Sequence, residues 1–225
     1  MTAHEPRRTP RPDGETVVPL VRAALARRAS RGGAAPDSHG AGGPAVGARR
    51  GPVVVAIDGR SGSGKSDLAA DLAGRLAAEP GLGAPGAVVV LALEEAYRGW
   101  HGLAVGLGAV AAGVLEPLSR GQAGSVRRYD WHAGRVDGVL TVPAPGAPLP
   151  RVLVVEGCGA GSAICAPFVD VLVWLEAPED VRRARAMARD AGTWGNLWDE
   201  WAAQEQALLV ARDARSTADL VLRTG

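Results

Sequence analysis

The chain has 225 residues, of which 47% are hydrophobic, so it is long and apolar enough for one α/β domain with a sizeable core. Its formal net charge of +1 argues against a general nucleic-acid binder, which would carry a clear basic excess. No apolar run could span a bilayer, and Cys158 and Cys165 form neither a disulfide framework nor a C-x-x-C motif, so we expect a cytoplasmic protein without a membrane or nucleic-acid partner.

The N-terminal part differs in composition from the rest of the chain. Residues 1–14 and 30–51 are rich in Gly, Ala, Pro and Arg and are predicted to be disordered. Between them, residues 15–29 have the pattern of an amphipathic helix whose apolar side is formed by Val17, Val18, Val21, Ala24 and Leu25. The arginines here could contact nucleic acid or an acidic partner, but a solvated tail is the simpler interpretation. We therefore predict a flexible segment, 1–51, that contains this helix, followed by a folded domain, 52–225.

Lys65 is the only lysine of the chain, whereas the other 24 basic residues are arginines. It lies in the string G-R-S-G-S-G-K-S of residues 59–66, which fits the phosphate-binding P-loop (Walker A) pattern G-x-x-x-x-G-K-[ST]. A β-branched run, 53–57, precedes the string, and an apolar helical pattern, 67–78, follows it. A glycine-rich turn that binds nothing would not explain why a strand precedes the string and a helix follows it. The sequence therefore predicts a nucleotide site, with Ser66 as a Mg²⁺ ligand.

Apolar strands alternate with helical patterns in the rest of the chain. Strands are predicted at 87–93, 151–155, 169–175 and 219–222, and helices near 102–118, 178–191 and 197–214. Nearly continuous apolar strands separated by helices indicate a parallel sheet covered on both faces. We therefore predict a three-layer α/β/α P-loop NTPase fold with a mostly parallel five-stranded sheet, whose ligands lie at the carboxyl ends of the strands.

Acidic residues follow two of these strands, at the same edge of the sheet as the P-loop. Glu94 and Glu95 come after the second strand, where a carboxylate could accept a proton from a substrate hydroxyl, but two surface glutamates explain the pattern equally well. Glu156 follows the third strand and is predicted to orient Mg²⁺ or its waters, since Gly157 permits close backbone approach. Asp58, just before the loop, is a candidate neighbour of the metal or the acceptor.

Two further segments carry charged side chains. Arg182, Arg185 and Arg189 share one side of a predicted helix, which is typical of a solvated face paired with Glu179, Asp180 and Asp190. In a phosphoryl-transfer enzyme, such arginines could instead approach the transferring group when a lid closes. Residues 127–132, R-R-Y-D-W-H, are expected to form a loop that offers a small acceptor a stacking platform and polar contacts. We assign no role to His132.

Residues 57–66, I-D-G-R-S-G-S-G-K-S, resemble the opening of the uridine kinase family of P-loop kinases. In that family an acidic residue at the end of the second strand stands three positions before a tyrosine, as Glu94 stands before Tyr97 here. The family's lid pattern R-x-x-R-x-x-x-R-D is matched by Arg182, Arg185, Arg189 and Asp190, and Glu156-Gly157 resembles its E-G step. The resemblance spans about residues 53–223. Residues 97–103 and 127–132 depart from the family's nucleoside-binding elements and look like those of a divergent bacterial branch.

The resemblance implies an ATP- and Mg²⁺-dependent kinase that phosphorylates a hydroxyl of a small acceptor, with a nucleoside as the leading candidate. We expect catalytic roles for Lys65, Glu94, Arg185 and Arg189. ATP binding is expected at Gly59, Arg60, Ser61, Gly62, Ser63, Gly64, Lys65, Ser66, Asp67 and Arg182. The expected metal ligands are Ser66 and Glu156, and the expected acceptor contacts are Asp58, Tyr97, Arg128, Asp130 and Trp131.

The sequence is also compatible with other functions. The acceptor could be a nucleotide, a sugar acid or a pantothenate-like alcohol, or the chain could be a regulatory protein that binds ATP without turnover. A GTPase is excluded because its N-K-x-D motif needs a second lysine, and the L-S-G-G-Q-like signature of an ABC-type ATPase is absent. A homo-oligomer is compatible with the sequence.

Overall fold

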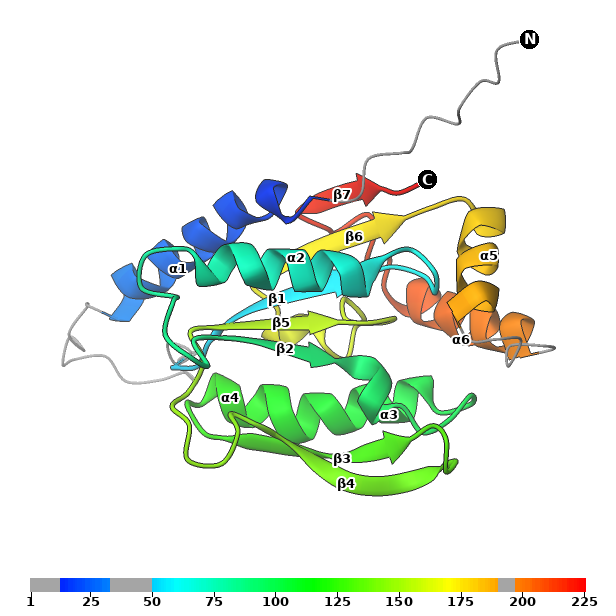
Figure 1. The fold of residues 1–225 in the computed structure, drawn as a ribbon, viewed down its shortest axis with the longest axis horizontal. Coiled ribbons are helices and arrows are strands. Elements are labelled where there is room, and N and C mark those ends of the chain that lie inside the picture. The colour runs from blue at the N-terminus through cyan, green and yellow to red at the C-terminus, as the bar shows by residue number, and fades with distance from the viewer. Residues whose placement is uncertain (1–12, 33–49, 190–196) are drawn as a thin grey trace, which may run out of the picture.

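The computed structural model describes residues 13–32, 50–189 and 197–225 (Figure 1). Of the segments 1–14 and 30–51 that are predicted to be disordered, residues 1–12 and 33–49 lie outside the described residues, and so does Asp190 of the lid pattern. Residues 30–32 are helical, so the prediction is wrong there. Among the described residues, no helix is both long and apolar enough to cross a membrane.

Five strands form the central sheet, in the order β2-β5-β1-β6-β7, and every neighbouring pair is parallel. Their bounds are β1 Val53–Asp58, β2 Val88–Ala92, β5 Val152–Glu156, β6 Val171–Glu176 and β7 Leu220–Arg223. The register places Glu156 between Ile57 and Ala92 at the carboxyl end of the sheet. This arrangement confirms the predicted parallel five-stranded sheet.

Side chains of the central strand β1 alternate between two hydrophobic cores, because successive residues of a strand point to opposite faces. Val53, Val55 and Ile57 pack with α1 (Val18–Gly32) and α2 (Lys65–Ala77). Val54 and Ala56 join the core on the other face, which Figure 1 shows covered by the green helices. The helical segments of that face are α3 (Leu103–Val110), a π-helical turn (Ala111–Leu115), α4 (Glu116–Ser119) and α6 (Leu197–Ala211). The predicted three layers are confirmed.

Helix α1 and the short 3₁₀ turn η1 before it (Gly14–Thr16) pack against this domain. The predicted apolar side is buried or half-buried in the core next to α2 and β1. Arg28 Nη2 donates to both carboxylate oxygens of Asp170, at 2.8 and 2.7 Å, which fastens α1 to the amino end of β6. The helix runs to Gly32, three residues beyond its predicted end. The division of the chain at residue 51 stays a prediction, but α1 shares the core of the following domain.

The prediction of a loop at residues 127–132 is wrong, since most of this segment is strand. β3 (Gly124–Asp130) and β4 (Arg135–Val142) form an antiparallel hairpin outside the main sheet. Val126 and Val142 are buried in the core, whereas most of the other hairpin side chains are exposed. Apolar contact on one face therefore positions a hairpin that also carries several charged side chains.

Two elements lie at the carboxyl end of the sheet, since η2 (Leu93–Ala96), a 3₁₀ helix, follows β2 and α5 (Glu179–Arg189) follows β6. Another 3₁₀ helix, η4 (Ala166–Phe168), precedes β6 and lies at the amino end of that strand. In Figure 1, α5 and α6 lie beyond the arrowheads of the parallel strands. This is the edge where the P-loop joins β1 to α2, so the candidate ligand residues gather here.

Candidate phosphate-binding site

The glycine-rich string forms a tight loop between β1 and α2, as the sequence predicts. Gly64 has φ +95° and stands at the N-cap of α2, so the loop turns directly into the helix and its N-terminal N–H groups. Gly62 has φ +78°, and a Cβ there would lie 2.1 Å from the carbonyl oxygen of Arg182. The loop therefore needs glycine at residue 62 both for its backbone conformation and for the close approach of α5.

Lys65, the first residue of α2, is only 8% exposed. Its Nζ donates to the carbonyl oxygen of Arg60 at 3.0 Å, within the loop itself. Burial alone lowers the pKa of this ammonium, but electrostatic interactions with Cys158, Glu205, Glu156 and Asp58 outweigh burial and raise the pKa above its ordinary value. Lys65 is therefore a fixed positive charge inside the loop at neutral pH.

Ser66 and Glu156 bring two oxygen ligands together beside this lysine. Ser66 Oγ donates to Glu156 Oε1 at 3.1 Å, which joins the start of α2 to the end of β5. Burial raises the pKa of Glu156, while the charge of Lys65 opposes this shift. A hydroxyl and a carboxylate are hard oxygen ligands of the kind that Mg²⁺ prefers when nucleotide phosphates complete its coordination. The pair therefore fits a Mg²⁺ site.

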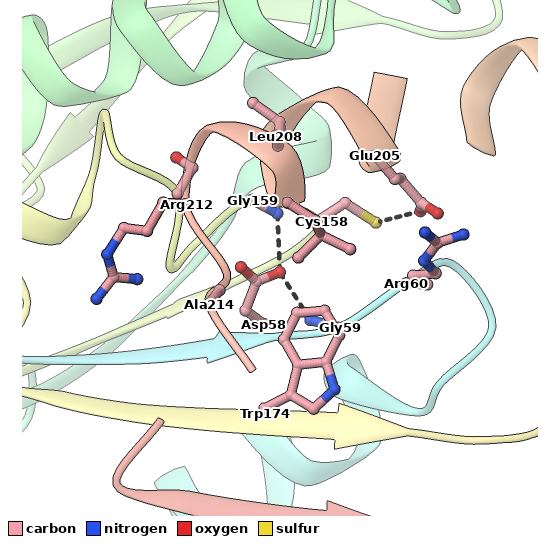
Figure 2. A pocket seen from close by; sticks show the side chains of 12 residues that line it. Asp58, Gly59, Arg60, Cys158, Gly159, Trp174, Glu205, Leu208, Arg212 and Ala214 are labelled. Atoms are coloured by element: carbon pink, nitrogen blue, oxygen red, sulfur yellow. Dashed lines mark hydrogen bonds between the residues drawn. The ribbon is translucent and has the colours of Figure 1, made fainter. Parts of the chain in front are cut away.

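Asp58 is buried and points away from solvent into the loop that follows β5 (Figure 2). Its Oδ1 accepts the N–H groups of Gly59 at 2.7 Å and Gly159 at 2.8 Å, and its Oδ2 accepts that of Gly161 at 2.8 Å. Burial raises the pKa of Asp58, and these three hydrogen bonds and Lys65 oppose the shift. Asp58 therefore links the P-loop to the loop after β5, which is a structural role that the sequence did not indicate.

The three arginines of α5 occupy different positions. Arg182 is buried, and its guanidinium donates to the carbonyl oxygens of Ala177 at 3.1 Å and Ser61 at 3.2 Å. Arg185 is exposed, and its Nη1 donates to Thr224 Oγ1 at 3.1 Å. Arg189 is also exposed, and its positive charge tends to lower the pKa of Glu156.

Residues that the sequence did not single out also hold the P-loop. Thr224, which follows β7, donates through Oγ1 to the carbonyl oxygen of Ser63 at 2.8 Å. Glu205 of α6 is buried and accepts the backbone N–H of Ser61 at 2.8 Å. Among the other loop residues, Arg60 donates to Gln206 Oε1, and Asp67 is exposed in the first turn of α2.

Glu94 and Glu95 belong to the 3₁₀ helix η2 and not to an extended strand. The strand alternation that would place them on opposite sides therefore does not apply. Glu94 is exposed, and its negative charge raises the pKa of both Glu156 and Tyr97. Glu95 instead pairs with Arg128 of the hairpin, with 3.8 Å between Oε2 and Nε. The charge of Glu94 thus acts on Glu156, whereas the carboxylate of Glu95 is engaged with the hairpin.

The remaining predicted acceptor residues lie near η2, but several are engaged within the protein. Tyr97 is 3% exposed and donates through its hydroxyl to the carbonyl oxygen of Cys158 at 2.9 Å. Asp130 Oδ1 accepts the N–H groups of His132 and Ala133, both at 2.9 Å, and so closes the hairpin turn. Trp131 Nε1 donates to the carbonyl oxygen of Glu94 at 2.9 Å, which fastens the hairpin to η2.

An aromatic cluster connects this hairpin to α6. Trp131 packs edge-on against Trp100 and Tyr129, each with 5.2 Å between ring centroids. Trp201 of α6 packs against Trp100 at 6.1 Å and Tyr97 at 5.4 Å. The hairpin, the segment after η2 and α6 thus share one aromatic contact region beside Glu94.

The sequence and the structure were compared with those of known proteins. No protein-family model matches the sequence, and no curated protein matches it. Among solved structures, the chain is similar to one described as a possible uridine kinase from Bacillus stearothermophilus, with a TM-score of 0.53 and 16% identity over 92% of this chain and 99% of that chain. The chain has the fold of a P-loop kinase. The chain is also similar to a structure described as a candidate fructose transport system kinase from Silicibacter sp. TM1040, with a TM-score of 0.48 and 22% identity over 90% of this chain and 98% of that chain.

Proposed function

We propose that the protein is an ATP- and Mg²⁺-dependent kinase that transfers the γ-phosphate to a hydroxyl of a small molecule, with a nucleoside as the leading acceptor. The observation that carries the proposal is the hydrogen bond of 3.1 Å between Ser66 Oγ and Glu156 Oε1, next to the buried ammonium of Lys65. These are the oxygen ligands and the point charge that phosphoryl transfer requires at the β- and γ-phosphates.

In this proposal, the P-loop and the N-terminus of α2 bind the ATP phosphates through backbone N–H groups. Ser66 and Glu156 would hold Mg²⁺, which neutralises charge on the β- and γ-phosphates when it is bound. Lys65 stabilises the negative charge that develops on the transferred group. Arg185 and Arg189 are exposed on α5 and are proposed to contribute further positive charge.

Glu94 is the proposed general base. It is exposed at the carboxyl end of β2, and its charge acts on Glu156, whereas Glu95 is paired with Arg128 of the hairpin. A carboxylate in this position can accept the proton of the acceptor hydroxyl as the γ-phosphate is attacked. The aromatic cluster around Trp131 and Trp100 lies beside it, which supports an acceptor with a flat ring such as a nucleoside.

The test is the release of ADP from ATP and Mg²⁺, measured in a coupled assay with a panel of nucleosides, nucleotides, sugar acids and pantothenate-like alcohols. We expect turnover with at least one nucleoside and none by the Lys65→Ala protein. Turnover only with another class of compound would change the proposed acceptor but leave the proposed kinase activity in place. ATP binding by calorimetry without turnover would favour the non-catalytic regulatory protein, and absence of ATP binding would refute the proposal.

The proposed place of action is the cytoplasm. Cys158 and Cys165 are both free and buried, which suits a compartment that keeps thiols reduced and supplies ATP.

A further inference from the structure

Ser61, in the first half of the P-loop, is held by three separate segments of the fold. Its N–H donates to Glu205 Oε1 of α6 at 2.8 Å, and its carbonyl oxygen accepts from Arg182 Nη1 of α5 at 3.2 Å. Its hydroxyl lies 3.4 Å from the sulfur of Cys158, in the loop after β5. Because both backbone groups are bonded to different helices, the peptide units around Ser61 cannot rotate without breaking a buried hydrogen bond.

Glu205 is the unusual member of this group. It is a carboxylate on the mostly apolar helix α6, yet it is only 4% exposed. Burial of a carboxylate is unfavourable unless hydrogen bonds satisfy it. The same Oε1 accepts from Trp201 Nε1 at 3.0 Å and from Cys158 Sγ at 3.2 Å, the second of which is drawn in Figure 2. Three donors thus converge on one oxygen of a buried acid beside the phosphate-binding loop.

The charge of Glu205 also acts on the site. It tends to raise the pKa of both Lys65 and Arg182, so it lies close to the two cationic groups that contact the loop carbonyls of Arg60 and Ser61. The hydrogen bond from the N–H of Ser61 places Glu205 against the loop backbone, which its carboxylate supports.

We infer that Glu205 is a positioning residue of the nucleotide site: through the N–H of Ser61, it holds the P-loop in the conformation that receives the phosphates of ATP. Arg182 supports Ser61 as well, through the hydrogen bond to its carbonyl oxygen. The sequence had suggested a direct ATP contact for this arginine. The inference rests on the proposed binding of ATP at this loop.

The experiment compares three single substitutions on α6 by calorimetric titration with ATP and Mg²⁺. Glu205→Leu keeps the size of the side chain and removes the acceptor, Glu205→Gln keeps an acceptor oxygen, and Glu200→Leu changes an exposed glutamate of the same helix. We expect Glu205→Leu to raise the Kd for ATP about tenfold, the fold-change that corresponds to one lost buried hydrogen bond. Glu205→Gln and Glu200→Leu should stay within about threefold of the wild type, since neither removes that bond.

A role confined to folding predicts a different result. It would lower the Tm of the Leu variant and leave its Kd for ATP unchanged at a temperature well below melting, which would overturn the inference. An equal loss of ATP affinity in the Gln and Leu variants would overturn it as well, because the hydrogen-bond acceptor would then be irrelevant.

Hydrogen exchange on the wild-type protein gives a second measurement that needs no variant to fold. We expect the Ser61 amide to be protected in the absence of nucleotide, because Glu205 accepts its hydrogen bond. Exchange at the rate of a free amide would overturn the inference. This readout does not depend on ATP, so it separates failure of this inference from failure of the proposed function, which would appear as no ATP binding by the wild type.

Discussion

Substitution of Asp58 by Asn distinguishes a structural role from the acceptor contact that the sequence suggested. The carboxylate is 3% exposed and accepts three backbone N–H groups, two on Oδ1 and one on Oδ2. An asparagine offers one carbonyl oxygen and one NH₂ group, so at least one of the three donors would face another donor. A buried donor without an acceptor costs about 1–3 kcal/mol. For a protein of this size each kcal/mol lowers Tm by about 2–4 °C, so we expect a fall of about 2–12 °C.

Thermal unfolding followed by circular dichroism measures this fall. The control is Asp67→Asn, an exposed aspartate in the first turn of α2, which should leave Tm nearly unchanged. In the coupled assay, the KM for the acceptor should change little for the Asp58 variant at a temperature where it is folded. An unchanged Tm together with a raised KM for the acceptor would refute the structural role and restore Asp58 as a substrate contact.

Four further substitutions test the site and the packing. Lys65→Ala should abolish ATP-dependent turnover with an unchanged circular dichroism spectrum, because loss of such an electrostatic donor costs about 3 kcal/mol or more in the transition state; wild-type turnover would remove the kinase assignment. Gly14→Ala should lower Tm, because its Cβ would lie 2.8 Å from the Cα of Leu72 in α2; an unchanged Tm would show that η1 does not pack there. Glu94→Gln should lower kcat about 10²- to 10⁴-fold in the coupled assay with ATP binding retained, and Glu95→Gln much less; equal small effects would exclude both as the base.

The central sheet and the P-loop could be predicted from the sequence because their signals are local. The run Val53–Asp58 is buried along its whole length, so its β-branched residues read as a strand without any knowledge of its neighbours. The helix at residues 18–32 was visible for the same reason, since the apolar side found from periodicity is the side that enters the core. Patterns that arise from the burial of one face can be recognised in a single sequence.

The hairpin and the support of the P-loop could not be predicted, because they depend on contacts between distant residues. In β3 and β4 only a few apolar side chains face the core, and the charged residues between them resemble a loop. Glu205 reads as an ordinary polar position of a helix, and Thr224 as a residue near the end of the chain. Only the fold brings them to Ser61 and Ser63, which are 144 and 161 positions away in sequence.

The choice between Glu94 and Glu95 shows how the premise of a prediction can fail while the prediction itself stays open. Alternation along an extended strand would place these two consecutive side chains on opposite sides, but the backbone turns into a 3₁₀ helix at Leu93. The structure supplies a different reason, because Glu95 is paired with Arg128 while the charge of Glu94 acts on Glu156. Glu95 and Arg128 are both about half exposed. Their ion pair therefore contributes little to stability, and its main effect is to orient the Glu95 side chain. Disruption of the pair by Arg128→Ala should therefore leave kcat nearly unchanged if Glu94 alone is the base.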